Sequence, residues 1–300
     1  MSKTAKKDIY QELTDRIIAK LEEGVKPWQP NWSRYGLARN AATGRIYSGI
    51  NAFILNLFCV HPIPYYISFK QAKAMGGKIK KGAKSERVYF YTSYHKDENG
   101  KNISEEQAAA LNGMGEETQK IHVLKYYNVF NIEDVEDVEI ELPQVVLTQH
   151  EQIEACEQII SGFANAPEYV FEDADRAYYA PEPDKLNMPK LEQFKTPEAY
   201  YLTYFHELTH STGHASRLNR EGIVEPSKFK DERYSREELV AEMGAAFLAG
   251  YAGIDGEAEV ENSAAYLDGW LKILKEDKKL IFKAAADAQK AVNYILGKAA

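Results

Sequence analysis

The chain has 300 residues, of which 44% are hydrophobic and 27% charged, and its formal net charge at pH 7 is −8. This composition is ordinary for a globular protein with a sizeable core, and no apolar run reaches the roughly 18 residues that a membrane span needs. The first residues lack the apolar segment of a secretory signal, and Cys59 and Cys156 lie far apart, so we expect a cytoplasmic protein without disulfides or a membrane span.

The charge is distributed unevenly along the chain. Residues 1–95 carry a net charge of +10, whereas residues 131–300 carry −16. A basic front and an acidic back favour two domains with different partners. We therefore expect one domain over residues 1–131, an acidic linker over 132–147 and a second domain over 148–300.

The front half alternates helical and β patterns. Apolar residues four apart within 5–23 predict an amphipathic helix, whereas the apolar segment 51–60 fits either a helix or a strand. Residues 65–77 predict a strand that becomes a short helix. Two Tyr-rich segments, 87–95 and 121–130, predict strands on either side of a hairpin insertion or mobile loop. These elements indicate an α+β domain.

The back half is predicted to be mainly helical, so the expected fold class of the whole chain is α+β. The predicted elements are helices near 148–163, from about 197 to 213, near 235–252 and over 260–296, with an extended stretch at 176–189. The second of these helices has a clear start, because Thr196 suits the N-cap position and Pro197 the first helical position.

The stretch YFHELTHSTGH, residues 204–214, holds three of the seven histidines. On a helix, His206 and His210 lie one turn apart on the same face. Two imidazoles held in this way can bind one Zn²⁺ at about 2.0–2.1 Å each. Glu207 would then lie beside the metal, where it can take a proton from a metal-bound water. This is the HExxH arrangement of zinc peptidases, with Glu207 as the general base.

A catalytic zinc site needs a third protein ligand. His214 is a weak candidate, because it follows the end of the helix and the longer HExxHxxGxxH pattern would require a histidine where Ser216 stands. The helix near 235–252 is apolar almost all round, so a carboxylate at Glu242 would be costly unless it were paired or bound to metal. Glu238 lies one turn earlier on the same face.

One of these two acids should bind the metal, and the other should orient a ligand histidine. The arrangement resembles the two-helix site of Glu-type zincins, which favours Glu238 as the ligand, whereas burial favours Glu242. We expect Glu242, with Glu238 as the alternative. Glu237 suits an acid at a helix N-terminus that faces the dipole. Zn²⁺ is the expected metal, and another divalent metal is the alternative.

A basic and aromatic stretch in the front half predicts a nucleic-acid surface. Lysine and arginine neutralise phosphates, and aromatic rings stack on unpaired bases, which suits single strands better than a duplex. A solvated lysine-rich loop before an ordinary core strand is the alternative interpretation. The candidate DNA-binding residues are Lys70, Lys73, Lys78, Lys80, Lys81, Lys84, Arg87, Tyr89 and Tyr91.

Five stretches of the chain together resemble one protein family. They are DIYQELTDRIIAKLEEGVKPW, NAATGRIYSGIN, SFKQAKAMGGKIKKG, FHELTHSTGHASRLNR and EELVAEMGAAFL. In this order they are similar to the ArdC-type antirestriction proteins of conjugative plasmids, whose N-terminal region is shared with TraC-type primases. The residues that match are Trp28, Asn40, Thr43, Gly44, Tyr47, Gly49, Asn51, Lys70, Gly77, Lys81, Gly82, His206, Glu207 and His210. The Glu-rich segment 96–120 departs from the pattern.

The resemblance implies an N-terminal single-stranded-DNA-binding domain and a C-terminal zincin-like metallopeptidase domain that together shield incoming DNA from restriction. Three hypotheses follow for the activity. The chain is a peptidase that acts on a protein near DNA, such as a restriction component, or a DNA-shielding protein with a silent zincin domain, or an accessory of a primase or conjugation apparatus. The intact Glu207 favours the first. The sequence leaves the oligomeric state open.

Overall fold

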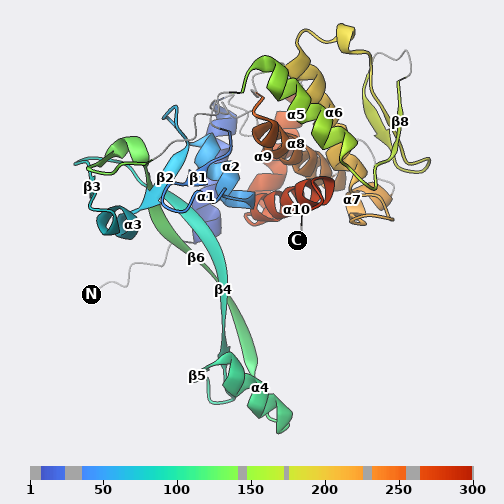
Figure 1. Ribbon diagram of the computed structural model, residues 1–300. Coiled ribbons are helices and arrows are strands. Elements are labelled where there is room, and N and C mark those ends of the chain that lie inside the picture. The colour runs from blue at the N-terminus through green and yellow to red at the C-terminus, as the bar shows by residue number, and fades with distance from the viewer. Residues whose placement is uncertain are drawn as a thin grey trace.

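The chain forms a helical body, a mixed sheet beside it and a long two-stranded arm that projects away from both (Figure 1). The computed structural model describes residues 8–23, 36–140, 147–171, 176–225, 232–254 and 264–298. The predicted α+β fold class is confirmed. None of the helices within these residues is both long and apolar enough to cross a membrane.

Two helices of the front half pack onto the body. Helix α1 (Ile9–Glu22) begins at Asp8, whose side chain accepts from the Tyr10 backbone N–H, and it buries the predicted apolar face. The ambiguous apolar segment is helix α2 (Gly49–Leu57). It is apolar on most sides because it contacts two separate cores: Phe53 packs into the large core of the body and Leu55 into a small core beneath the sheet.

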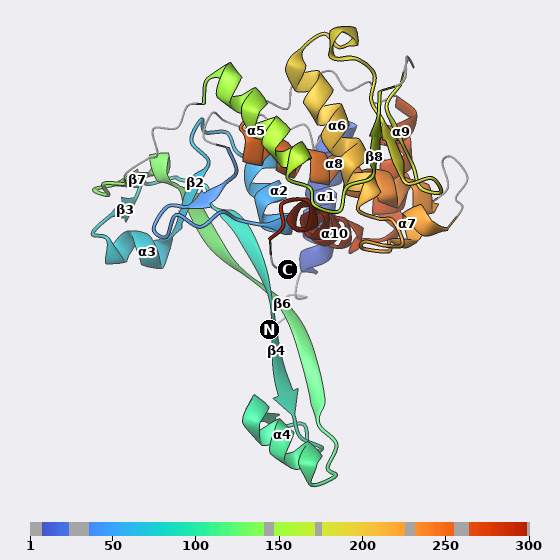
Figure 2. The same ribbon diagram turned by 45° about the vertical axis from the view of Figure 1, so that its right-hand side comes forward.

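The main sheet has five strands in the order β1-β2-β6-β4-β5. These are β1 (Arg39–Asn40), β2 (Tyr65–Ser68), β4 (Glu86–Lys96), β5 (Asn102–Ile103) and β6 (Gln119–Asn131). Strands β4 and β6 pair antiparallel without a break from Glu86 opposite Val129 to Lys96 opposite Gln119. Their outer parts form the arm, and helix α4 (Glu105–Gly113) lies at its far end (Figure 2). The insertion is therefore a structured hairpin.

A small lobe carries the lysine-rich segment. Helix α3 (Phe69–Ala74) follows β2, and Ser68 and Gln71 form a capping box at its start. Strand β3 (Lys78–Ile79) pairs with β7 (Val135–Glu136), which follows the short 3-10 helix η1 (Ile132–Asp134). The beginning of the predicted linker is thus part of a sheet, and residues 141–146 lie outside the described residues.

Several residues of the family pattern have structural roles in the front half. The Asn51 side chain donates to the Tyr89 carbonyl at 2.8 Å and accepts from the Tyr89 N–H at 2.7 Å, which ties α2 to β4. Asn40 accepts from the backbone N–H of Thr43 at 3.1 Å and so fixes a turn. A Cβ at Gly77 would lie 2.0 Å from the Val138 side chain, so only glycine fits there. Trp28 lies outside the described residues.

The back half is mainly helical, as predicted. Its elements are α5 (Gln149–Ser161), β8 (Glu168–Val170), β9 (Tyr178–Ala180), β10 (Lys185–Asn187), η2 (Leu191–Gln193), α6 (Pro197–Ser211), α7 (Glu221–Val224), α8 (Glu232–Ala252), α9 (Ala264–Glu276) and α10 (Leu280–Ile295). The prediction of one helix over 260–296 is wrong. The chain turns at Asp277, whose carboxylate accepts from the Lys279 N–H at 2.9 Å, and this ends α9.

One hydrophobic core joins the two halves. It contains Leu13 and Ile17 of α1 together with Leu239 of α8 and Trp270 of α9. Polar contacts follow the same interface, because the Thr14 hydroxyl donates to the Lys278 carbonyl at 3.0 Å. The domain boundaries proposed above stay a prediction, but residues of both halves belong to the same hydrophobic core.

Candidate metal centre and nucleic-acid surface

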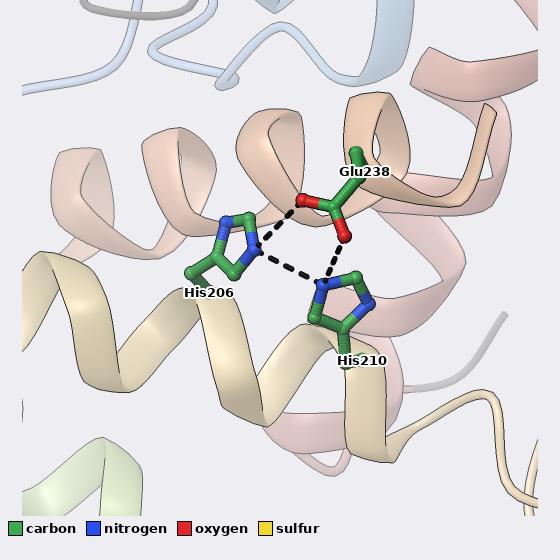
Figure 3. A group of neighbouring side chains, drawn as sticks. All are labelled: His206, His210 and Glu238. Carbon is green, nitrogen blue, oxygen red and sulfur yellow. Dashed lines mark hydrogen bonds and ion pairs between the residues drawn. The ribbon is translucent and has the colours of Figure 1, made fainter. Parts of the chain in front are cut away.

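Helix α6 carries both histidines of the HExxH motif. It begins as the sequence predicts, with the Thr196 hydroxyl accepting from the Ala199 N–H at 3.2 Å and Pro197 at the first position. Both imidazoles point toward α8, and their Nε2 atoms lie 3.0 Å apart (Figure 3). This convergence is what the four-residue spacing predicts.

Helix α8 supplies a carboxylate to the same point. The two oxygens of Glu238 lie 3.5 Å from His206 Nε2 and 3.4 Å from His210 Nε2. Glu242 instead lies on the other side of the His206 ring, with its carboxylate 3.9 Å from Nδ1. The expectation that Glu242 is the third ligand therefore has no geometric support, because burial reports packing on α8 and not the direction of the side chain.

The sequence interpretation of Glu237 is wrong. This residue does not lie at a helix N-terminus, because α8 begins at Glu232, and only 7% of its side chain is accessible. Its carboxylate lies 3.3 Å from His210 Nδ1 and also accepts hydrogen bonds from the Arg220 guanidinium. The pairing between Arg220 and Glu237 depends on how the segment after α6 folds back, and no periodicity in the sequence signals it.

The charges at the centre reinforce one another. Burial opposes protonation of both histidines, but the surrounding carboxylates outweigh it. Glu238 raises the pKa of His206, and Glu238 with Glu237 raises the pKa of His210 well above its usual value. Burial also opposes ionisation of Glu238, yet the two histidines hold its pKa far below the usual range. The centre thus consists of two buried imidazoles whose protonated forms are stabilised by the surrounding carboxylates.

The three groups fit a divalent metal. Their donor atoms all lie within 4.8 Å of one another. Donors about 2.0–2.1 Å from one tetrahedral ion would be roughly 3.4 Å apart. The two Nε2 atoms are 3.0 Å apart, and each lies 3.4 or 3.5 Å from a different oxygen of Glu238, which is close to this spacing. Two imidazoles and one carboxylate are also a ligand set that zinc accepts in catalytic sites.

A cavity of about 540 Å³ opens at the centre. Glu207 lines it together with both histidines, and Tyr178 and Tyr234 form part of its wall. His214 does not join the three converging groups. It lines a neighbouring cavity of about 520 Å³, and its Nδ1 accepts from the Ser216 backbone N–H at 3.2 Å.

The structure separates the predicted DNA-binding residues into two groups. The exposed group consists of Lys70, Lys73, Lys78, Lys80, Lys81, Lys84 and Tyr91. Tyr89 is only 5% exposed and packs edge-on against Phe282, so it offers no surface to a base. Arg87 is held by the Glu12 carboxylate at 2.7 Å and lies over the Tyr126 ring, so its charge is already compensated.

Two other aromatic side chains are better placed for stacking. Phe90 on β4 and Tyr127 on β6 are 41% and 45% exposed, and their ring centroids lie 5.8 Å apart. Exposed Lys125 lies directly opposite Phe90 in the sheet. This grouping depends on the register between two strands that are distant in sequence, and the sequence alone did not give that register.

Comparisons with known proteins agree with these two regions. One family model, described as the N-terminal domain of anti-restriction factor ArdC, matches residues 7–130, and another, a zincin-like metallopeptidase, matches residues 156–287. The chain is 32% identical over 304 residues to DNA primase TraC of Escherichia coli, which is 97% of this chain but 27% of that primase. A second TraC primase of Escherichia coli is 31% identical, and the chain spans 20% of its length.

Two solved structures are similar to the whole chain. They are the metal-free and Mn(II)-bound forms of the antirestriction protein ArdC from plasmid R388, with TM-scores of 0.76 and 0.74 and 32% identity. The matches cover 96% and 97% of this chain and 97% and 98% of the two ArdC chains. Because the likeness extends over nearly the full length of both proteins, this chain belongs to the ArdC family of antirestriction proteins.

Proposed function

We propose that the back half of this antirestriction protein is a divalent-metal-dependent peptidase with Glu207 as its general base. The observation that carries the proposal is the convergence of His206, His210 and Glu238 in a cavity that Glu207 also lines. These three residues would hold the ion. A divalent ion bound there supplies a Lewis acid that polarises a carbonyl group and lowers the pKa of a water molecule.

The chain's own residues account for the remaining chemistry. Glu207 follows His206 directly on α6, so its side chain leaves the helix about 100° away from that histidine. It is thus free to accept the proton of the attacking water and to deliver it to the departing amine. Glu237 lies 3.3 Å from the outer nitrogen of His210, where it holds that ring in place. Glu242 lies 3.9 Å from the outer nitrogen of His206 and places a negative charge beside it.

Zinc is the metal that we propose for the resting protein. The donor set of two histidines and one glutamate suits zinc. The Mn(II)-bound relative supports a site that accepts more than one divalent ion. Carboxylate ligands suit Mn²⁺ as well.

The test compares Glu207→Gln with wild type, each loaded with Zn²⁺ or Mn²⁺, on casein and on a denatured protein. Glutamine keeps the shape of the side chain but cannot act as a base, so we expect hydrolysis to fall by about 10²–10⁴-fold. Metal content should not change. Glu198→Gln, on the same helix but outside the cavity, serves as the matched control. Undiminished hydrolysis by Glu207→Gln would refute the assignment, as would a loaded wild type that cleaves neither protein.

The front half supports a second function, the binding of single-stranded DNA. The specific observation is the combination of six exposed lysines on the lobe of α3 and β3 with the exposed Phe90 and Tyr127 rings on the arm. The lysines would neutralise phosphates and the rings would stack on unpaired bases. We place the interface on these residues in place of Tyr89 and Arg87.

The lysines can be tested through the salt dependence of binding. Replacing Lys78, Lys80 and Lys81 with Gln in the full chain should reduce the slope of log K against log salt by about 2, since each phosphate contact on a single strand contributes roughly 0.7. Replacing Lys272, Lys275 and Lys290 of the back half provides a control of equal charge change. A slope that the first triple variant leaves unchanged would place the DNA elsewhere.

A further inference from the structure

Arg220 is buried beside the candidate metal centre, but its guanidinium bonds to none of the side chains of the three proposed metal ligands. It follows α6 and stands immediately before α7, and only 10% of its side chain is accessible. A guanidinium in such a place must be compensated by charge and hydrogen bonds. The partners that compensate it lie on two different helices.

On the α8 side, Arg220 forms a bidentate ion pair with Glu237. Its Nη2 donates to Glu237 Oε1 at 2.6 Å and its Nε to Oε2 at 3.0 Å. This two-point geometry fixes the plane of the carboxylate as well as its position. Burial opposes the ionisation of Glu237, but Arg220 and His210 outweigh it and keep its pKa low.

On the α6 side, Arg220 caps the C-terminal end of the helix. Its Nη1 donates to the Thr212 hydroxyl at 2.6 Å, and its Nη2 donates to the Thr209 carbonyl at 2.8 Å. The last carbonyls of a helix carry partial negative charge and lack partners within the helix, so a cation there is stabilising. One side chain thus joins the end of α6, which bears His210, to α8, which bears Glu238.

Two glycines make room for this side chain. A Cβ at Gly222 would lie 2.8 Å from the Glu237 Cβ, and a Cβ at Gly213 would lie 3.0 Å from Arg220 Nη2 and 2.5 Å from the Ile223 side chain. Gly222 therefore lets the segment approach α8 closely, and Gly213 leaves room for Arg220 and Ile223 beside the end of α6.

We propose that Arg220 is a positioning residue of the metal centre, which acts on His210 through Glu237. The carboxylate that Arg220 holds lies 3.3 Å from His210 Nδ1. An ionised carboxylate only accepts, so Nδ1 bears a hydrogen, and in the neutral imidazole that binds a metal the Nε2 lone pair then faces His206 and Glu238. The proposal rests on the metal centre proposed above, because it assigns Arg220 a role toward that centre.

The test measures Mn²⁺ affinity and the visible absorption of bound Co²⁺ in the full chain. Arg220→Ala and Glu237→Gln should each weaken Mn²⁺ binding about 10–100-fold and shift the Co²⁺ bands, since outer partners of ligand histidines contribute that much. The double variant should be no weaker than the worse single variant, because both act through one path. Arg220→Lys keeps the positive charge but has one donor atom in place of the several of a guanidinium. Its Mn²⁺ affinity should therefore lie between those of Arg220→Ala and wild type.

Arg217 supplies the matched control. It is also buried on this segment, but its guanidinium pairs with Asp184 and Tyr179 and not with Glu237, which lies against His210. Arg217→Ala should lower the melting temperature yet leave Mn²⁺ affinity within about threefold of wild type. If Arg220→Ala fails to fold, Arg220→Lys and Glu237→Gln decide the matter.

The outcomes separate this inference from the metal centre itself. Unchanged Mn²⁺ affinity and Co²⁺ spectra in the Arg220 and Glu237 variants would overturn the positioning role alone. Full Mn²⁺ binding by a His206→Ala/His210→Ala variant would instead overturn the centre. Loss of affinity in the Arg217 control equal to that in Arg220→Ala would reduce Arg220 to a general stabilising role and refute the inference.

Discussion

Asp184 and Arg217 form an ion pair that supports the wall of the cavities. Arg217 is 1% accessible and pairs with the Asp184 carboxylate, which also accepts from the Tyr179 hydroxyl at 2.7 Å. Burial raises the pKa of Asp184, but the hydrogen bonds from Arg217 and Tyr179 outweigh it, so the pKa is lowered. The stabilisation of the fold by this ion pair is therefore present above about pH 3.9, the pKa of an aspartate in the unfolded chain. It is lost as the pH falls through the lower pKa of Asp184 in the folded chain.

We predict that Asp184→Asn lowers the free energy of unfolding by about 3 kcal/mol at pH 7, because it leaves a buried guanidinium without its counter-charge. The difference from wild type should shrink below about pH 4, where Asp184 of the unfolded wild-type chain begins to take up a proton. Urea unfolding at pH 7 and pH 3 measures both values. Asp287→Asn, which removes an exposed pair with Lys290, should change stability by less than about 0.5 kcal/mol. An Asp184→Asn deficit that is equal at both pH values would contradict this account.

Single residues also show how far the sequence could lead. His206, Glu207 and His210 follow from helical geometry, because residues on one helix have fixed relative directions. The choice between Glu238 and Glu242 does not, because it depends on the rotation of α8 relative to α6. The environment of Glu237 could not be predicted for a related reason. Its partner Arg220 lies in the segment after α6, and no pattern within α8 indicates that contact.

At the scale of elements, the arm of β4 and β6 provides the most direct test of the DNA surface. Phe90→Ala and Tyr127→Ala should each weaken the binding of an oligothymidine by about 1–3 kcal/mol, the usual contribution of stacking on one base. The salt dependence should not change, since no charge is removed. Fluorescence anisotropy at several salt concentrations measures both quantities.

Phe171→Ala is the control for the arm, because Phe171 is also an exposed aromatic residue, at 58%, but lies in the acidic half. It should leave DNA affinity unchanged. Equal losses in the Phe171 variant and the arm variants, or no loss in either arm variant, would remove the stacking surface from the proposal.

Most helices and strands were predictable where one face alone is buried. Helix α1 shows clean spacing for this reason, and the two arm strands have the β-branched and aromatic content of a sheet. The α2 segment was ambiguous because two cores cover it. The break between α9 and α10 was missed because it contains no glycine or proline, and the turn depends on the Asp277 side chain.

At the scale of the whole molecule, the common core predicts that the two halves unfold together. Ile17 is fully buried in a core that also holds Trp270 and Phe282 of the back half. Ile17→Ala should therefore destabilise the entire chain by about 2–5 kcal/mol, in a single transition. Calorimetry with near-ultraviolet circular dichroism tests this prediction. Two separate transitions, only one of them moved by Ile17→Ala, would show that the halves are independent.

Two variants separate the contributions of the two proposed functions to the protection of DNA. Glu207→Gln removes the proposed base, and neutralisation of the lysine lobe removes the proposed phosphate contacts. Neither change alters the core that the two halves share. If protection in a conjugation assay survives the first change but not the second, DNA occupancy is the mechanism, which is the outcome that we expect. Loss of protection with Glu207→Gln alone, at unchanged DNA affinity, would make cleavage the mechanism.

His206, His210 and Glu238 are proposed to hold one divalent metal ion together. A Zn²⁺ and Mn²⁺ titration of the metal-free chain, with elemental analysis of the product, tests this assignment. We predict one ion per chain in wild type and none in His206→Ala/His210→Ala. Glu238→Gln should reduce affinity more than Glu242→Gln, whose loss should stay within about 10–100-fold. Full occupancy in the double histidine variant, or a greater loss with Glu242→Gln, would contradict the account.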